Sequence, residues 1–486
     1  MNSLPSPAVH TKRIGPTLKP DCSRVLLRPF RPTTDEIARR LTSRVMALPE
    51  EDVGGLLESV LSEFAGRHGQ VEKIFRRRFE QVQLYLEPGA RPSSKRQALI
   101  GAYFTHEYSL EAAALFNPSI VPHPDQSGIA PGALRFVLSL RATGEGHISS
   151  ITFRTGVVSP QHSITFTQPE KFAVEAERVP NVAYEKELFA KKLREAGVLN
   201  DFSRRILELL PDSFTLQQLQ GVLSSATPET DPDALRATRG IFLLAESNYD
   251  VHFAPETRLS QRVLFPASSS QSNGIEDARF VRFEDDDGGV MYYATYTAYD
   301  GRIILPQILE TPDFLHFKFN TLNGPAVQNK GMALFPRKIK GKYVMLSRQD
   351  DENILLMFSD HVHFWQDPKV LVPPAQPWEF VKIGNCGSPV ETKAGWLVLT
   401  HGVGAMRKYC LGALLLDLED PSRVIGRLRE PLLSPNETER EGYVPNVVYT
   451  CGVLLQGTEL IIPYAMSDSA TSFATIGLDE LLASME

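Results

Sequence analysis

Two adjacent carboxylates and a guanidinium occupy the segment Gly274 to Arg279, which precedes a β-rich stretch of this 486-residue chain. A carboxylic acid that protonates a leaving oxygen, such as that of a glycoside, needs a raised pKa at neutral pH, and a neighbouring like charge can raise it. Glu276 would raise the pKa of Asp277 in this way, whereas Arg279 would lower it. The same pattern is common on solvated loops, so the surrounding elements decide whether it indicates a catalytic site.

Short apolar strands separated by turns dominate the chain from Asn117 onward. Similar units start roughly 50 to 60 residues apart, the scale of a four-stranded propeller blade. These units are residues 289–296, 341–347, 394–399 and 457–464, and the strand pair that begins at Leu134 is a fifth. We therefore predict a mainly β protein, a five-bladed β-propeller. A two-sheet sandwich ranks lower, because five units with independent turns match radial repetition better than Greek-key crossing.

Apolar residues at helical spacing mark two further segments. We predict an N-terminal helical domain over residues 1–115 and a propeller over residues 116–486, with a helical insertion at about 184–235 and strands again from Gly240. The run Arg76-Arg77-Arg78 is expected to be a solvated helix face. The helices carry no chemistry that the sequence reveals. They could cover one end of the ring or form the subunit interface of a homo-oligomer.

Composition restricts the function classes. A net charge of −7 argues against nucleic acid as a partner. The cysteines Cys22, Cys386, Cys410 and Cys451 are scattered, which favours reduced core thiols over a zinc site or a disulfide framework. The sequence shows neither a secretory signal nor an apolar run long enough for a membrane span, so we expect a soluble cytoplasmic protein that binds no membrane.

The chain resembles the inverting β-mannoside phosphorylases of glycoside hydrolase family 130, which are five-bladed propellers. The resemblance covers about residues 117–482 and rests on the segments 117–120, 274–279, 293–299, 329–331, 335–336, 400–403, 416–421 and 439–452. Members with the pattern Glu-Asp-Pro-Arg use that aspartate as general acid, so the resemblance assigns this role to Asp277. Ala278 stands where those members have proline, which loosens one backbone dihedral without removing a functional group.

A phosphorylase needs a cationic site where an inverting hydrolase needs a base, because phosphate is already anionic and nucleophilic. The resemblance places Lys330 and His401 at phosphate or at the adjoining sugar, although His401 could instead be a hydrogen-bonded strand-end residue. Other cations on separate predicted turns or strand ends could join them in a ring. We assign Arg348, Arg279 and Arg141 to phosphate; Arg141 and Arg407 could equally be surface or strut residues.

The sugar would be held by a second group of residues. By the same resemblance the expected contacts are Glu276, Tyr299, Asp300, Tyr409, Asn446 and Asp468. Trp378 could stack on a pyranose face, because aromatic rings suit the apolar side of a sugar. Each of these residues could also serve packing alone.

These features predict an enzyme that cleaves β-mannosides or manno-oligosaccharides with inorganic phosphate, needs no metal or organic cofactor, and releases α-mannose 1-phosphate by inversion. One alternative is a β-mannoside hydrolase, in which Glu379, Glu391 or Glu439 would activate water. The other is a carbohydrate-binding propeller without catalysis. The β-1,2 or β-1,4 linkage and the acceptor sugar depend on loop shape and stay open.

Overall fold

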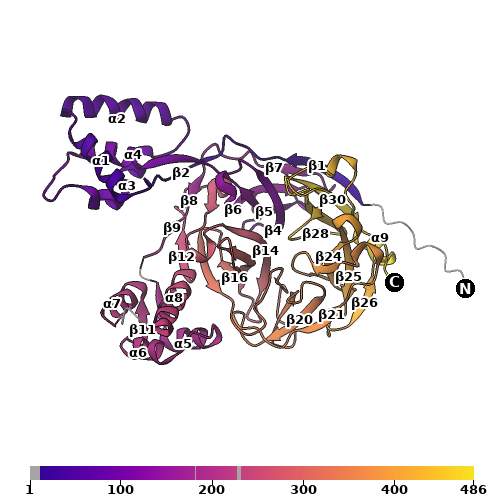
Figure 1. The fold of residues 1–486 in the computed structure, drawn as a ribbon. Helices are drawn as coiled ribbons and strands as arrows, with labels where there is room; N and C mark the ends of the chain where they lie inside the picture. The colour runs from indigo at the N-terminus through magenta and orange to yellow at the C-terminus, as the bar shows by residue number, and fades with distance from the viewer. Residues whose placement is uncertain (1–10, 181, 227–230) are drawn as a thin grey trace, which may run out of the picture.

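The structure is a computed structural model that describes residues 11–180, 182–226 and 231–486. Strands make up most of its ordered elements, and the longer helices gather in two groups beside them (Figure 1). The predicted mainly β class is therefore confirmed. Residues 1–10 of the predicted helical domain and residues 227–230 of the predicted insertion lie outside the described residues.

Within the described residues, most strands form five antiparallel sheets, here numbered I to V along the chain. Sheet I contains β4 (Ala114–Pro122), β5 (Leu134–Thr143), β6 (Ser149–Val158) and β7 (Ile164–Phe166). Sheet II contains β14 (Gly274–Glu284), β15 (Val290–Tyr299), β16 (Ile304–Thr311), β17 (His316–Thr321), β12 (Tyr249–His252) and β9 (Glu177–Arg178). Sheet III contains β18 (Ala333–Leu334), β19 (Tyr343–Ser347), β20 (Ile354–Ser359) and β21 (Lys369–Val372).

The last two sheets complete the β region. Sheet IV contains β22 (Lys382–Asn385), β23 (Val390–Thr392), β24 (Gly395–Val403), β25 (Tyr409–Leu416) and β26 (Val424–Arg427). Sheet V contains β27 (Val448–Tyr449), β28 (Leu454–Gln456), β29 (Glu459–Met466), β30 (Ala470–Gly477) and β1 (Lys12–Leu18). One parallel pair, Gly274 with Ser149, joins sheets I and II into a continuous hydrogen-bonded sheet. The strand β13 (Arg262–Leu264) adds to sheet I by pairing with β6, and it also pairs with β8 (Val174–Glu175).

Each sheet packs against the next, and sheet V returns to sheet I, where β29 and β30 contact β4. Figure 1 shows the same succession by colour, with the yellow strands of sheet V beside the purple strands of sheet I. Apolar side chains fill the space between neighbours. Phe153 and Phe280 meet between sheets I and II, and Phe335 and Trp396 meet between sheets III and IV. Burial of these large rings supplies much of the driving force for sheet association.

The N-terminal strand β1 lies in the last sheet, not in the helical domain predicted for residues 1–115. It pairs with β30, Lys12 opposite Thr475, and so joins the two ends of the described chain. Arg13 on β1 also bonds Glu439. Sequence periodicity did not reveal this, because β1 is short, mostly exposed and contains Gly15 and Pro16.

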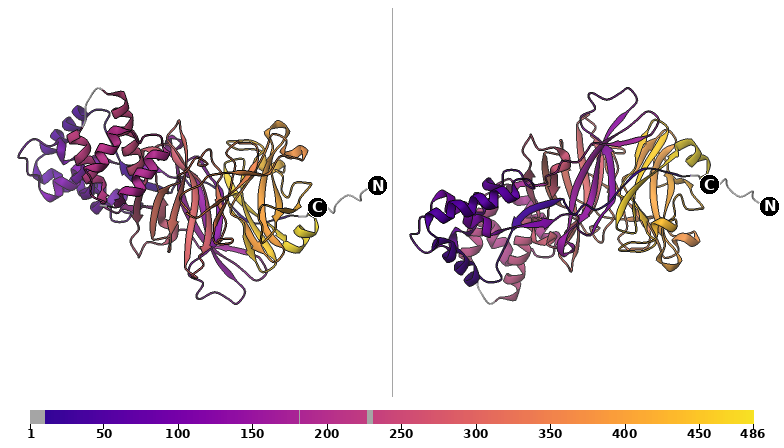
Figure 2. Two further views of the ribbon diagram at one scale, coloured as in Figure 1. Left: turned by 90° about the horizontal axis from the view of Figure 1, so that it is seen from below. Right: turned by 90° about the horizontal axis from the view of Figure 1, so that it is seen from above.

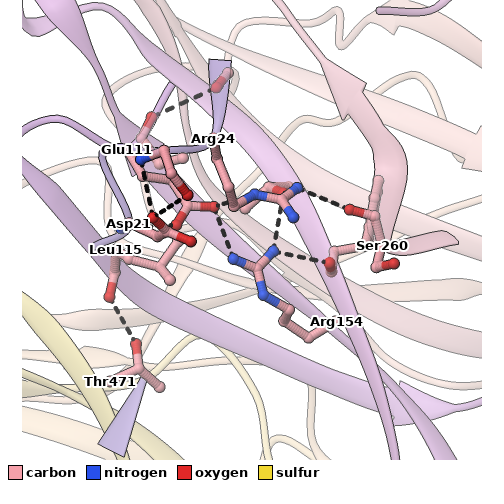
Figure 3. Close-up of polar contacts among 12 residues, drawn as sticks. Asp21, Arg24, Glu111, Leu115, Arg154, Ser260 and Thr471 are labelled. Carbon is pink, nitrogen blue, oxygen red and sulfur yellow. Dashed lines mark hydrogen bonds and ion pairs between the residues drawn. The ribbon is translucent and has the colours of Figure 1, made fainter. Parts of the chain in front are cut away.

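After β1, a buried charge cluster attaches the chain to sheet I (Figure 3). Glu111 is fully buried and lies 3.0 Å from Arg24 and 2.7 Å from Arg154, and the backbone amide of Asp21 donates to its other oxygen. Arg24 also donates to the carbonyl of Ser260. Loss of one member would leave a buried charge unpaired, so the cluster fixes the path of the chain toward the helices.

The first helical group follows β2 (Val25–Pro29), which pairs with β3 (Thr105–Ser109). Its helices are α1 (Asp35–Met46), α2 (Glu50–Phe64), α3 (Val71–Val82) and α4 (Ser94–Tyr103). Thr34 and Ser93 cap α1 and α4 through their side-chain oxygens. Figure 2 shows this group and the second helical group together at one end of the molecule, far from the C-terminus.

The second group forms the insertion. It contains β10 (Ala183–Glu185), α5 (Lys186–Glu195), α6 (Asp201–Glu208), β11 (Ser213–Thr215), α7 (Leu216–Ala226) and α8 (Pro232–Ser247). Because α8 runs to Ser247, the expected end at about 235 and the expected strand from Gly240 are wrong. The run Ile241 to Ala245 is continuously apolar, and such a run fits a buried helix as well as a strand.

A short helix, α9 (Leu478–Ala483), is the last element of the fold. None of the helices in the described ranges has the length and apolar character needed to cross a bilayer.

Cys386, Cys410 and Cys451 are buried free thiols, but Cys22 is exposed, so the expectation of core thiols is wrong for that residue.

Candidate active site

Two β-bulges place an asparagine and the predicted acid side by side. The pairing of β14 with β15 shifts between Glu276 and Arg279, and the pairing of β4 with β5 shifts between Phe116 and Ser119. Within these bulges Asp277 has φ +55° and Asn117 has φ +48°. A bulge redirects a side chain, and left-handed backbone in a residue other than glycine is concentrated at functional sites.

Asp277 sits in a network of hydrogen bonds. Its Oδ1 accepts from Asn117 Nδ2 at 2.6 Å and from Arg141 Nη1 at 3.2 Å, while Arg141 Nη2 donates to Glu276 Oε1 at 2.6 Å. Arg141 is itself held by Ser149 Oγ, at 2.9 Å from its Nε. Arg141 therefore binds both carboxylates of the motif, and its expected role at phosphate changes to one of positioning Asp277 and Glu276.

The pKa of Asp277 does not follow the expected effect of Glu276. Burial would raise this pKa, but Arg141, Arg279 and Lys330 together hold it well below its ordinary value. Burial raises the pKa of Glu276 instead. Without ligand, the cations therefore keep Asp277 ionised, and a role as acid requires their charge to be offset.

Arg279 is a strut and not a phosphate ligand. It is 1% exposed, and its guanidinium donates to the carbonyls of Cys386 and Asp277 and to the hydroxyl of Tyr449 at 2.7–2.9 Å. The assignment to phosphate is thus wrong, because these protein acceptors enclose the group. Arg279 fixes the backbone of Asp277 relative to sheets IV and V.

Lys330 is the cation best placed to receive an anion. Among the described residues it has no ion-pair partner. Its charge contributes to the lowered pKa of Asp277 and opposes the rise in the pKa values of Glu276 and Asp468. Arg348 lies beside it, with Nε donating to the Lys330 carbonyl at 3.1 Å. This approach requires glycine at position 331, where φ is +90° and a Cβ would lie 2.5 Å from Arg348 Nε.

His401 lies behind Arg348. Its side chain is fully buried, and its Nε2 lies 3.0 Å from Arg348 Nη1. Burial and the nearby Arg348 hold the pKa of His401 well below its ordinary value, so the ring is neutral and Nε2 accepts the hydrogen bond. The sequence placed His401 at phosphate or at the adjoining sugar, or as a hydrogen-bonded strand-end residue; in the structure the ring is enclosed and its hydrogen bond goes to Arg348. His401 positions Arg348.

Asp468 reaches the same charge network from the turn between β29 and β30, with φ +52°. Burial, reinforced by the charge of Asp277, raises the pKa of Asp468 to about 6, while Arg141, Arg407 and Lys330 oppose the shift. The amide of Leu115 donates to the carbonyl of Ser469 at 3.0 Å, which ties this turn to β4 near Asn117. Asp468 is therefore close enough to Asp277 for the two carboxyls to influence each other.

Three more of the residues expected to contact sugar are Tyr409, Asn446 and Tyr299. Tyr409 stacks on His401, with ring centroids 5.9 Å apart, and its amide donates to the carbonyl of Asn446. Asn446 has φ +62° and accepts from Arg440 Nε at 2.7 Å. Tyr299 is the last residue of β15 and lies between Gly274 of β14 and Ile304 of β16. These three residues stay near the network.

Two expected sugar contacts have local roles. Asp300 uses its carboxylate to accept the amides of Arg302 and Ile303 in its own turn. Trp378 donates to the carbonyl of Arg429 and fills the space above Gly402 and Gly412, where a Cβ would lie 2.4–2.5 Å from the indole. The indole is thus committed to packing on sheet IV.

The glutamates considered as hydrolytic bases are engaged elsewhere. Glu379 is fully buried and bonds Arg427 and the amides of Ala375 and Gln376. Glu391 pairs with Arg337 at 2.8 Å. Glu439 accepts from Arg13 at 2.7 Å and from the hydroxyl of Tyr464 at 2.7 Å. Each carboxylate thus has a structural partner.

Replacing Glu439 with glutamine should destabilise the fold by about 1–2 kcal/mol, because it removes the charge that binds Arg13 of β1. Thermal unfolding measures this change, and the exposed Glu437→Gln provides the control. Turnover per folded molecule should stay at the parent level. A normal melting temperature with lost turnover would assign Glu439 to catalysis instead.

The chain is similar to proteins named as mannoside phosphorylases. The family described as β-1,4-mannooligosaccharide phosphorylase, glycoside hydrolase family 130, matches residues 241–486. A 1,2-β-oligomannan phosphorylase of Thermoanaerobacter sp. strain X514 is 38% identical over 232 residues, 46% of this chain and 75% of the relative. A β-1,2-mannobiose phosphorylase of Listeria innocua is 30% identical over 236 residues, 46% of this chain and 63% of the relative.

Among solved structures, the β-1,2-mannobiose phosphorylase from Listeria innocua in complex with β-1,2-mannobiose aligns with a TM-score of 0.46 and 20% identity, over 82% of this chain and 95% of that one. The sequence matches define an enzyme of the glycoside phosphorylase class. The chain belongs to glycoside hydrolase family 130, which confirms the predicted resemblance.

Proposed function

We propose that this enzyme cleaves β-mannosides with inorganic phosphate and releases α-mannose 1-phosphate with inversion. The names of its relatives support a mannoside substrate and phosphorolysis. The observation that carries the site assignment is that a positioned carboxyl lies near a cation. Asp277 is held by Asn117 and Arg141, and it is influenced by the charge of Lys330, which forms no ion pair with any residue that the structure describes.

In this mechanism phosphate binds at Lys330 and the adjacent Arg348, and Asp277 protonates the glycosidic oxygen directly or through a sugar hydroxyl. The negative charge of phosphate offsets the cations that keep Asp277 ionised, which raises its pKa and lets it carry a proton. Phosphate then attacks the anomeric carbon from the opposite face. Asn117 Oδ1, which is buried and has no hydrogen-bond partner among residues 11–180, 182–226 and 231–486, would accept a hydrogen bond from a sugar hydroxyl.

The proposed architecture is a five-bladed propeller in which sheets I to V are the blades. The closed series of contacts between successive sheets and the pairing of β1 with β30 support it. Such a ring has no free sheet edge at its seam and directs the turns of different blades toward one axis. Asn117, Asp277, Lys330 and Asp468 would meet there from four sheets or the turns that join them.

A mannoside hydrolase is the second candidate, but the ion pairs of Glu379, Glu391 and Glu439 do not favour it. Cleavage of β-1,2- and β-1,4-linked manno-oligosaccharides should therefore require phosphate. Sugar release is to be measured in phosphate buffer and in a phosphate-free buffer brought to the same ionic strength with chloride. We expect turnover only with phosphate; equal release in both buffers would establish a hydrolase.

A further inference from the structure

A second cavity lies apart from Asp277, between the N-terminal helices and sheet II. Its volume is about 1300 Å³, and its walls come from β2 and the following loop, α3, β8, β9 and β12. Figure 1 shows β2 and α3 on the side of the molecule that also carries β8 and β9. The proposed phosphorolysis uses none of these elements.

Four of the arginines that line this cavity come from the N-terminal part of the chain. They are Arg28 and Arg31 from β2 and its loop, and Arg77 and Arg78 from α3. Glu175 pairs with Arg28, and Glu177 pairs with Arg77 at 3.0 Å. Neither Arg31 nor Arg78 forms an ion pair with a carboxylate among the described residues. The other charged lining residues are Lys73, Arg178, Asp35 and Glu256.

Of Arg31 and Arg78, Arg78 is the less exposed. Its Nη1 donates to Gln81, but its Nε is buried and has no acceptor within the part of the chain that the structure describes. Burial, followed by the charge of Arg28, lowers the pKa of Arg78 to about 10. A guanidinium that is destabilised by its neighbours gains stability when an anion enters, because the anion offsets the repulsion.

The cavity also has room and surface for a ring. Its volume exceeds that of common small-molecule pockets, about 300–1,000 Å³, so it admits more than a bare ion. Phe30 is 45% exposed beside Arg31, and Tyr85 lines the same wall. Aromatic faces suit sugars and nucleobases, while the planar fork of arginine matches phosphate oxygens.

We propose that this cavity is a second ligand site, which binds an organic phosphate, the phosphate ester of a sugar or a nucleoside, through Arg31 and Arg78. The ring of the ligand packs near Phe30 and Tyr85. A ligand bound there contacts both the helical group and the strands joined to sheet II, so it links the two parts of the chain. The run Arg76-Arg77-Arg78 of α3 was expected to be a solvated face. In the structure Arg76 pairs with Glu72, Arg77 pairs with Glu177, and Arg78 lines the cavity.

The neighbouring Arg76 offers a matched control. It lies on the same helix, outside the cavity, and pairs with Glu72 one turn away. Arg78→Gln and Arg76→Gln remove the same charge from the same helix. Adenosine diphosphate, mannose 6-phosphate and inorganic phosphate are to be titrated by calorimetry into the parent enzyme and both variants.

We expect at least one ester to bind the parent and Arg76→Gln alike, and to bind Arg78→Gln about tenfold or more weakly. The ester that does so identifies the source of the phosphate. In phosphate-free buffer, Arg78→Gln should melt no lower than the parent, because the lost charge was unfavourable. Equal affinities in the two variants, binding of inorganic phosphate but of neither ester, no binding at all, or a lower melting temperature for Arg78→Gln would overturn the proposal.

Discussion

Replacing Asp277 with asparagine should lower the rate of phosphorolysis by about 10³-fold or more, because the variant keeps the shape of the side chain and loses the transferable proton. The variant should still fold, since its amide oxygen can accept from Asn117 and Glu276 still binds Arg141. Initial rates with mannobiose and phosphate measure the effect. Asp360→Asn, at an exposed carboxylate that pairs with Lys342, is the control.

Leaving groups separate an acid from a positioning residue. A dinitrophenyl β-mannoside releases a weakly basic phenolate that needs no protonation, so Asp277→Asn should lose far less activity on it than on mannobiose. An equal loss on both substrates would mean that Asp277 only positions other groups. The proton would then have to come from elsewhere in the network, and Asp468, with its pKa of about 6, would be the next residue to test.

The second large effect is expected for Lys330→Met. It should raise KM for phosphate by about tenfold to a hundredfold, because a charge-assisted contact to the anion is lost. Stability should hardly change, since Lys330 has no ion-pair partner among the described residues. Lys369→Met, on an exposed strand of sheet III, is the control.

The alkaline limb of the pH–activity profile should move in one direction in Lys330→Met. Lys330 lowers the pKa of Asp277, so its removal raises that pKa and extends activity toward higher pH. An unchanged KM for phosphate, or an alkaline limb that moves to lower pH, would contradict the assignment of Lys330.

The sequence predicted the acid motif but not the backbone geometry that positions its carboxylate. Alternating apolar residues indicate strands, yet they do not show that Asn117 and Asp277 lie in bulges with left-handed backbone. The tolerance of Asn and Asp for this conformation was the available signal. Asn117 therefore had no assigned role, although it makes the shortest hydrogen bond to Asp277.

The sequence predicted which basic residues lie near the site more readily than what each of them does there. The sequence alone identifies Arg279, His401 and Lys330 as basic residues near turns or strand ends, but it does not show how deeply each of them is buried. Arg279 and His401 are almost fully enclosed, whereas Lys330 is partly exposed. Those depths arise from packing between sheets II, IV and V, which are distant in sequence.

The anomer of the first product tests the central claim most directly. Nuclear magnetic resonance of a reaction containing β-linked mannobiose and phosphate, followed from the first turnovers, distinguishes the products. Attack of phosphate opposite to Asp277 predicts α-mannose 1-phosphate as the first new species. Free mannose, or the β-anomer of the phosphate, would contradict an inverting phosphorolysis at this site.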